Sequence, residues 1–174
     1  MTPEDTLWIR MGAQRVRRYH TADIIGSQTV ADHTYGAVQI LRYLIADKPA
    51  THKLLAMEHM LDHDVAELET GDIPFPAKLG FPAIKAASRV AEVAIGQAYN
   101  LSEAVTPEIA KDCKEADLLE MAHFGFGQFK KGSSYGVEII ATIRAALEAR
   151  EPSAKAESFI SMIEDNVGIT YVSE

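Results

Sequence analysis

Hydrophobic residues recur at intervals of three and four along most of the chain, and strictly alternating runs are scarce. This period is typical of amphipathic helices, each of which turns one apolar stripe toward a core. We expect helices over residues 5–18, 29–48, 51–70, 83–100, 106–129 and 136–150, and a seventh that opens at residues 151–153. The pattern therefore predicts an all-α fold of about six to seven helices. Because no linker, internal repeat or low-complexity tract interrupts it, residues 1–174 are expected to form a single domain.

Local signals set several of these boundaries. Thr29 is a plausible N-cap of the second helix, and Thr106 followed by Pro107 and Glu108 is a strong start signal for the fifth. Gly71 can take the left-handed conformation that ends a helix. Residues 71–82 contain three prolines and two glycines, so we expect a loop there. Two further glycines, at 125 and 127, are expected to weaken the fifth helix.

Composition narrows the class of protein. The chain has 17 Lys and Arg against 25 Asp and Glu, a formal net charge of -8, which argues against non-specific binding to a nucleic acid polymer. Cys113 is the one cysteine, so no intrachain disulfide can form, and this suits a reducing cytoplasm. The sequence has no apolar run of eighteen residues, and its acidic N-terminus does not resemble a secretion signal. We therefore expect a cytoplasmic protein with no membrane partner.

One short segment departs from the acidic average. It concentrates positive charge in Arg10, Arg15, Arg17, Arg18 and His20. Most of these side chains are expected to lie on a solvated helix face. The alternative is an edge where one or two arginines face a substrate phosphate.

Three of the expected helices place an ionisable residue in an apolar stripe. His33 falls among Val30, Ala37, Leu41 and Leu44; Asp64 among Leu54, Met57, Leu61, Val65 and Leu68; Asp117 among Cys113, Met121 and Phe124. His63 precedes Asp64 and flanks the same inward face, because neighbouring residues differ by about 100° around a helix. Glu67, four residues after His63, is expected to lie above it on one side.

Buried carboxylates need a partner, because an unpaired one is costly. Asp64 and Asp117 could instead cap loops or pair with a basic residue, but the only evident candidate is Lys114, which we expect to extend to solvent. A lone histidine such as His33 is more often a hydrogen-bonded core residue than a ligand. A shared divalent cation accounts for all four residues at once. Two imidazoles and two carboxylates suit Zn, Co, Mn or Fe better than Ca, with Mg as an alternative.

Other catalytic patterns are absent from the sequence. It contains no G-x-x-x-x-G-K-[ST] loop, no G-x-G-x-x-G and no G-x-S-x-G elbow. Cys113 is expected to serve packing and not nucleophilic attack. The remaining histidines are expected to be surface or structural residues: His20, His52, His59 and His123.

The order H…HD…D on successive helices resembles the HD-domain phosphohydrolase superfamily. HDVAELETGDIPFPAK is similar to the H-D-x-x-E-x-x-x-G-D-x-P-x-P-x-K string of bacterial 5′-deoxynucleotidases, and RRYHTADIIGSQTVADHTYGAVQI is similar to their upstream block. The likeness runs from about residue 14 to 125 and implies an HD-domain helical bundle. It implies metal ligands at His33, His63, Asp64 and Asp117. It also implies Arg18 and Lys78 on phosphate, with Glu67 and Asp72 near the attacking water. Asp72 has an equal claim to a structural role in the turn after the helix.

The chain is also compact, as are the phage dATP triphosphohydrolases of the same superfamily. In that branch three positions form the base pocket, and here they are Tyr19, Thr21 and Pro76. Tyr19 stands where the bacterial enzymes tend to carry tryptophan, so base or sugar packing is expected to differ.

The resemblance implies a metal-dependent phosphohydrolase that acts on small deoxynucleotides. The expected activity is a phage-type dATP triphosphohydrolase, in the host cytoplasm if a phage encodes the chain. A 5′-deoxynucleotidase that acts on dNMPs is the alternative, and a nucleotide-binding regulatory HD protein is the non-enzymatic one. The branch also implies a homo-oligomer, with the apolar positions after residue 135 as either an interface or core.

Overall fold

The computed structural model describes residues 1–103 and 106–168. Residues 104–105 and 169–174 of the expected single domain lie outside the described residues. Its elements are α1 (Pro3–Gly12), a 3₁₀ turn η1 (Ala13–Arg15), β1 (Arg17–Arg18), β2 (Gln28–Thr29), α2 (Val30–Leu44), α3 (Ala50–Asp62), α4 (Glu67–Thr70), α5 (Phe75–Gly80), α6 (Pro82–Tyr99), α7 (Pro107–Lys130), α8 (Tyr135–Glu148) and α9 (Ala154–Val167). Within the described ranges, seven helices have ten residues or more, so the expected all-α class is confirmed.

The predicted helix starts at Thr29 and Thr106 are confirmed. The Thr29 hydroxyl caps α2 by accepting a hydrogen bond from the Asp32 amide. The Asp32 carboxylate in turn accepts one from the Thr29 amide, which completes a capping box. Thr106 accepts from the amide of Ile109 at the start of α7. These caps satisfy amides that the helix itself leaves free.

The first predicted helix is too long. After Gly12 the chain passes through η1, and Val16 adopts an extended conformation. Residues 17 and 18 then pair antiparallel with β2, Arg17 opposite Thr29 and Arg18 opposite Gln28. The strand pairing fixes Arg18 beside the start of α2, a placement that a continuous helix would not give.

The third predicted helix divides in two. α3 ends at Asp62, whose carboxylate binds the Ser102 amide and the Arg10 guanidinium, and α4 begins only at Glu67. The apolar stripe assigned across this break is therefore wrong for Leu54 and Leu61, which are 54% and 56% exposed. The buried face of α3 is instead formed by residues such as Ala56 and Met60.

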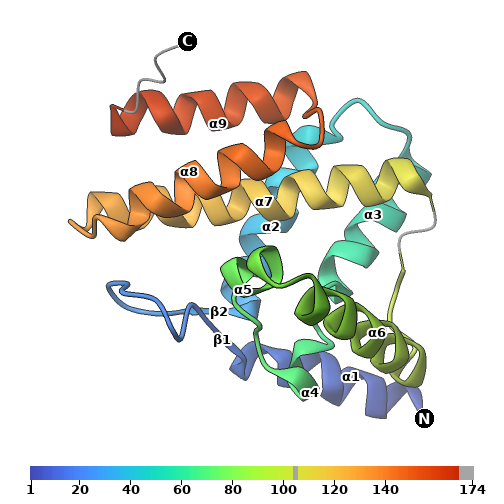
Figure 1. The fold of residues 1–174 in the computed structure, drawn as a ribbon. Helices are drawn as coiled ribbons and strands as arrows, with labels where there is room; N and C mark the ends of the chain where they lie inside the picture. The colour runs from blue at the N-terminus through green and yellow to red at the C-terminus, as the bar shows by residue number, and fades with distance from the viewer. Residues whose placement is uncertain (104–105, 169–174) are drawn as a thin grey trace.

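The segment 71–82 is not wholly loop. Gly71 has a positive φ of 71°, but its ψ of 164° lies outside the left-handed helical region that was expected, and a short helix, α5, follows from Phe75 to Gly80. α6 then starts at Pro82, where the missing amide costs no helical hydrogen bond. This corrected segment places α5 and α6 over the side of the molecule that carries α4 (Figure 1).

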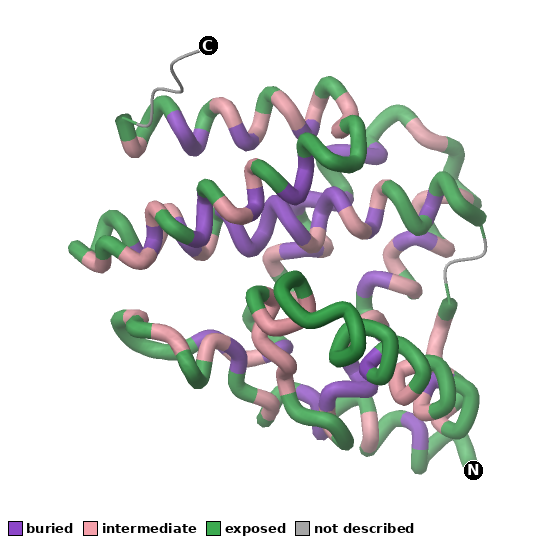
Figure 2. Tube along the Cα trace, in the orientation of Figure 1, coloured by how far each residue is buried: buried purple, intermediate pink, exposed green. Residues whose placement is uncertain are grey.

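α7 forms the centre of the fold and packs against α2, α3, α8 and α9 (Figure 1). It continues unbroken through Gly125 and Gly127, so neither glycine ends the helix. At Gly125 the absent side chain serves packing, because a Cβ there would lie 2.8 Å from the Gly136 carbonyl oxygen of α8. Figure 2 shows α7 largely buried and α6 largely exposed. The main core is therefore built on the α7 side.

The helices after residue 135 belong to this core. Ile140, Ile143 and Leu147 of α8 and Ile160 and Ile163 of α9 are all buried there. Core packing thus accounts for the apolar positions of this tail. Over the described ranges, the helices are too short or too polar to cross a membrane.

Candidate functional site

His33, His63 and Asp64 form a compact group. His33 lies inside α2 and is fully buried, while His63 and Asp64 follow directly after α3. The two Nε2 atoms are 3.3 Å apart, and Asp64 Oδ2 lies 3.2 Å from that of His63 and 3.7 Å from that of His33. One ligand atom from each residue lies within 4.8 Å of the others. The structure thus brings together three of the four expected metal ligands.

Asp117 approaches this group from α7. Its Oδ1 lies 3.1 Å from His33 Nε2, and its Oδ2 binds the ammonium of Lys114, three residues earlier. The Lys114 side chain is 43% exposed, as expected, but its ammonium also pairs with Asp117, which was not expected. An Oδ1 atom next to the Nε2 atom of a ligand histidine is consistent with a fourth ligand, which stays a prediction.

Both imidazoles are held from behind. His63 Nδ1 lies 2.6 Å from the Met60 carbonyl oxygen and donates to it, and His33 Nδ1 faces the carboxylate of Glu120. A hydrogen bond at Nδ1 leaves Nε2 with a lone pair, the form in which histidine binds a metal. The orientation of the two rings is therefore set by their neighbours.

Arg18 closes the group on the side of the strand pair. It is 8% exposed, and its Nη1 lies 2.7 Å from Asp64 Oδ2. Its buried Nε has no hydrogen-bond partner. The pairing of Arg18 with Asp64 could not be predicted from the sequence, because it depends on the position of β1. The arginine thus has one donor engaged with a carboxylate and another free.

Charged side chains of both signs stabilise one another inside the group. Burial alone would raise the pKa of Asp64, but His63, Arg18 and His33 hold it well below its ordinary value. Burial likewise opposes the charge on Asp117, whose pKa Lys114 and His33 depress. Burial and Arg18 would lower the pKa of His33, yet Asp117 and Glu120 outweigh them and raise it to about 9. Several carboxylates around two imidazoles therefore favour a cation.

Glu67 and Lys78 face each other next to the group. Glu67 is buried at the start of α4, and its Oε1 lies 3.8 Å from the Lys78 ammonium of α5. Burial first, and then the charge of Asp64, raise the pKa of Glu67 to about 8. Its buried Oε2 has no hydrogen-bond partner. Lys78 also lies 3.4 Å from Glu92 of α6, which ties α5 to that helix.

The remaining expected site residues are less closely joined. Asp72 lies 3.7 Å from His20 Nδ1, and no hydrogen bond or ion pair of the described residues links it to the three-residue group. Tyr19 has a positive φ, and its ring stacks on Phe124 with centroids 4.5 Å apart. Thr21 and Pro76 are exposed. Their expected roles at the base and the water stay predictions.

The donor set fits a divalent metal. It offers the Nε2 atoms of two histidines, each with a lone pair when the ring is neutral, and one or two carboxylates, a mixture that suits Zn and similar ions. Among the described residues, four carboxylates lie mostly buried in or beside the group, those of Asp64, Asp117, Glu67 and Glu120, and they outnumber the cationic side chains of Arg18, Lys78 and Lys114. His33, His63 and Asp64 are thus a divalent metal site, with Asp117 as the expected fourth ligand.

Sequence reasoning missed Glu120. It lies three residues after Asp117 on α7, so helical spacing places the two side chains on neighbouring positions. That spacing was a usable signal, because a second acid one turn beyond a buried acid also needs a partner. Gln28, which donates to Glu120 over 2.9 Å, carries no comparable signal.

The all-α bundle and its histidine–aspartate cluster define a metal-dependent hydrolase. Residues 13–131 match the model of the HD domain family, so the chain belongs to that family. Its motifs resemble those of the HD-domain phosphohydrolases. No curated protein matches the chain.

Solved structures share the fold. The HD phosphohydrolase DatZ of cyanophage S-2L, bound to dA and one catalytic Zn²⁺ ion, is 21% identical, with a TM-score of 0.70 over 94% of this chain and 96% of that one. An HD-domain phosphohydrolase from Listeria innocua is 19% identical, with a TM-score of 0.72 over 96% and 90%. The PH0347 protein from Pyrococcus horikoshii OT3 is 20% identical, with a TM-score of 0.66 over 95% and 98%.

Proposed function

We propose that this chain hydrolyses deoxynucleotides at the 5′ phosphate, acting as a dATP triphosphohydrolase that releases deoxynucleoside and triphosphate. The observation that carries the proposal is the position of Arg18. Its guanidinium lies against a metal ligand, Asp64, while its buried Nε has no partner. Phosphate oxygens can coordinate a divalent cation, and they can also accept a hydrogen bond from a free guanidinium N–H. A bound substrate phosphate satisfies both.

The metal ligands of the proposal are His33, His63, Asp64 and Asp117. When bound there, the ion supplies Lewis-acid stabilisation of charge on a nonbridging phosphate oxygen. Zn is favoured by the donor set, with Co, Mn or Mg as alternatives. DatZ, whose structure carries one catalytic Zn²⁺, supports this choice.

The positive charge for the remaining phosphate oxygens comes from Arg18 and Lys78. Both are fixed by acids, Arg18 by Asp64 and Lys78 by Glu67 and Glu92. In a chain with a formal net charge of -8, such prearranged charge is what attracts an anionic substrate.

Glu67 is the proposed group for proton transfer. Its carboxyl is buried, its pKa is raised to about 8 and its Oε2 is free to bind a water. With a divalent cation held by Asp64 and the two histidines, the pKa of Glu67 would fall toward the range in which its carboxylate can accept a proton. In the proposal Glu67 orients the attacking water and accepts its proton. It then gives this proton to the 5′ oxygen as the bond between that oxygen and the phosphorus breaks. Asp72 is the alternative for the same task.

The base is proposed to lie near Tyr19, Thr21 and Pro76. One face of the Tyr19 ring is already covered by Phe124, so a base can stack only on the other face. The structure of DatZ contains dA, which supports a purine deoxynucleoside as the occupant.

A homo-oligomer in the cytoplasm is part of the proposal. The helices after residue 135 contribute to the core. Other apolar side chains are exposed: Trp8 of α1 at 72%, Leu79 of α5, Val90 of α6, and Phe81 between α5 and α6. Exposed apolar side chains that form one contiguous patch commonly mark contacts between subunits. Light scattering after gel filtration measures the assembly directly.

A substrate panel tests the activity. The metal is removed with a chelator, Zn, Co, Mn or Mg is added back, and dNMPs and dNTPs are offered separately. Triphosphate released from dATP supports the proposal, whereas inorganic phosphate released from dNMPs identifies a 5′-deoxynucleotidase. Tight nucleotide binding without turnover under every metal would identify a regulatory protein and contradict hydrolysis.

A further inference from the structure

Glu120 is a buried acid that the proposed reaction does not use. It lies on α7 one turn after Asp117, with 4% of its surface exposed. One carboxylate oxygen, Oε2, contacts His33 Nδ1, on the opposite side of the imidazole from the Nε2 that faces Asp64 and Asp117. The acid therefore touches a metal ligand from the rear and stands outside the ligand group itself.

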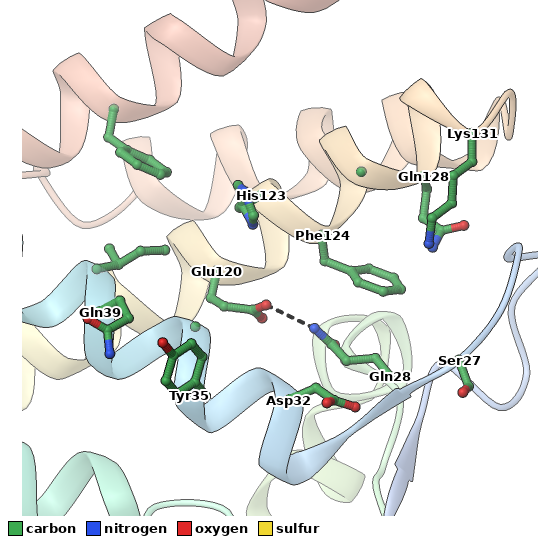
Figure 3. Close-up of a pocket in the computed structure, with 14 residues that line it drawn as sticks. Ser27, Gln28, Asp32, Tyr35, Gln39, Glu120, His123, Phe124, Gln128 and Lys131 are labelled. Carbon is green, nitrogen blue, oxygen red and sulfur yellow. Dashed lines mark hydrogen bonds between the residues drawn. The ribbon is translucent and has the colours of Figure 1, made fainter.

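Two further features fix the Glu120 carboxylate. Gln28 of β2 donates from Nε2 to the other oxygen, Oε1, over 2.9 Å (Figure 3). Gly36 of α2 leaves the space that the acid occupies: a Cβ at this glycine would lie 2.8 Å from Glu120 Cγ and 3.1 Å from Oε1. β2, α2 and α7 thus all contribute to the position of one carboxylate.

The same three residues, Gln28, Gly36 and Glu120, line a groove of about 530 Å³ between α2 and α7 (Figure 3). His33 lies behind them and is fully buried. The carboxylate therefore forms the wall between this groove and the imidazole. Because the Glu120 carboxylate is hydrogen-bonded to Gln28 and contacts His33 Nδ1, it fixes the His33 ring more strongly than an apolar contact would.

We infer that Glu120 is a positioning residue of the metal centre. Its carboxylate accepts the Nδ1 hydrogen of His33, which holds the imidazole in the tautomer whose Nε2 lone pair faces the metal. His63 obtains the same orientation from the Met60 carbonyl, so the two histidines use different acceptors for one purpose. A carboxylate behind a ligand histidine also makes the imidazole a stronger donor. The inference rests on the proposed metal centre and adds a residue to it.

The test measures metal binding, not turnover. Metal-free wild type and Glu120→Gln are titrated with Zn²⁺ in competition with a chromophoric chelator. Co²⁺ is bound in parallel, and its visible absorption reports the ligand geometry. We expect Glu120→Gln to weaken Zn²⁺ binding by roughly tenfold and Glu120→Ala by up to about 100-fold, the range for loss of such a partner. The Gln variant is the milder one because its amide oxygen can still accept the Nδ1 hydrogen.

Glu115→Gln is the matched control. Glu115 is also a buried acid of α7, but it binds the amide and hydroxyl of Ser153 at the start of α9. Its replacement is expected to lower the melting temperature while leaving the Zn²⁺ affinity and Co²⁺ spectrum unchanged. If Glu120→Gln behaves in the same way as this control, Glu120 is merely structural and the inference is wrong.

Gly36→Ala provides an independent test without touching the acid. The added methyl group must displace the Glu120 side chain, and alanine favours the helix that surrounds it. We expect weaker Zn²⁺ binding together with an intact helical circular dichroism spectrum. Wild-type affinity and spectrum in both Gly36→Ala and Glu120→Gln would overturn the inference. Failure of the wild type itself to bind any of the metals would instead overturn the proposed metal centre.

Discussion

Arg18→Met removes a guanidinium from the site and keeps a long unbranched side chain in its place. Arg18 is 8% exposed, and its partner Asp64 retains 18% exposure. Breaking a buried ion pair by removing one partner costs about 3 to 5 kcal/mol, and the partial exposure of Asp64 favours the lower end. For a chain of this size, about 3 kcal/mol lowers the melting temperature by roughly 6 to 12 °C. We expect that loss in the metal-free protein.

The loss is expected to shrink when Zn²⁺ is bound, because the cation then balances the charge of Asp64. Differential scanning fluorimetry with chelator and with saturating Zn²⁺ measures the difference between the two states. With metal in place, turnover of dATP is expected to fall by about 100-fold or more, the typical effect of removing one preorganised donor to a developing charge. The variant is therefore more stable with metal, yet still impaired in catalysis.

Arg10→Met is the matched control for this variant. Arg10 donates through Nε and Nη2 to Asp62, a buried carboxylate at the end of α3. Because this pair lies outside the ligand group, its loss is expected to lower the melting temperature equally with and without Zn²⁺. An Arg18→Met variant with the same melting loss in both states, or with wild-type turnover, would refute the role assigned to Arg18.

Three further outcomes follow from the fold and the site. Asp117→Ala is expected to abolish both metal retention and turnover, as measured by metal analysis after gel filtration; retained metal with full activity would exclude it as a ligand. Gly136→Ala is expected to destabilise the protein in urea unfolding by about 1 to 3 kcal/mol, because its Cβ would lie 2.3 Å from the Gly125 carbonyl oxygen. Gly127→Ala, with nothing within 4 Å, should stabilise it by about 0.5 to 1 kcal/mol, and equal effects of the two would contradict the packing described. Burial raises the pKa of Cys113 to about 12, above that of the unfolded thiol, so the native thiol stays protonated at pH 8 and an aromatic disulfide reagent should label it only after unfolding; fast native labelling would refute this.

The helices could be predicted where one apolar period spans a whole element. α2, α8 and α9 satisfy this condition, and Thr29 marks the start of α2. α7 is buried on several sides, and it could be predicted from its start signal at Thr106 and its length. The division of α3 from α4 could not be predicted in the same way. It depends on Asp62, which binds Arg10 and the Ser102 amide, and these partners lie far away in the sequence.

The site was predictable to a similar extent. The helical period brought His33 and Asp117 to inward positions, and the structure places them 3.1 Å apart. His63 and Asp64 were assigned to a helix face, whereas they lie in the turn after α3, so the correct grouping followed from a partly wrong local structure. Arg18 meets Asp64 only because β1 pairs with β2, and a strand of two residues leaves no periodic signal.

The two sides of the site are expected to differ in how easily they unfold locally, because α6 is largely exposed and α7 is largely buried. The histidines rest on α2 and the turn after α3, next to the densely packed α7, whereas Lys78 stands on α5, whose neighbour α6 is largely exposed (Figure 2). Segments with few buried contacts open first, so backbone amides of α5 and α6 should exchange with deuterated solvent well before those of α7. Such a site can admit ligands of different length next to α5 and α6, while the residues next to α7 keep one geometry.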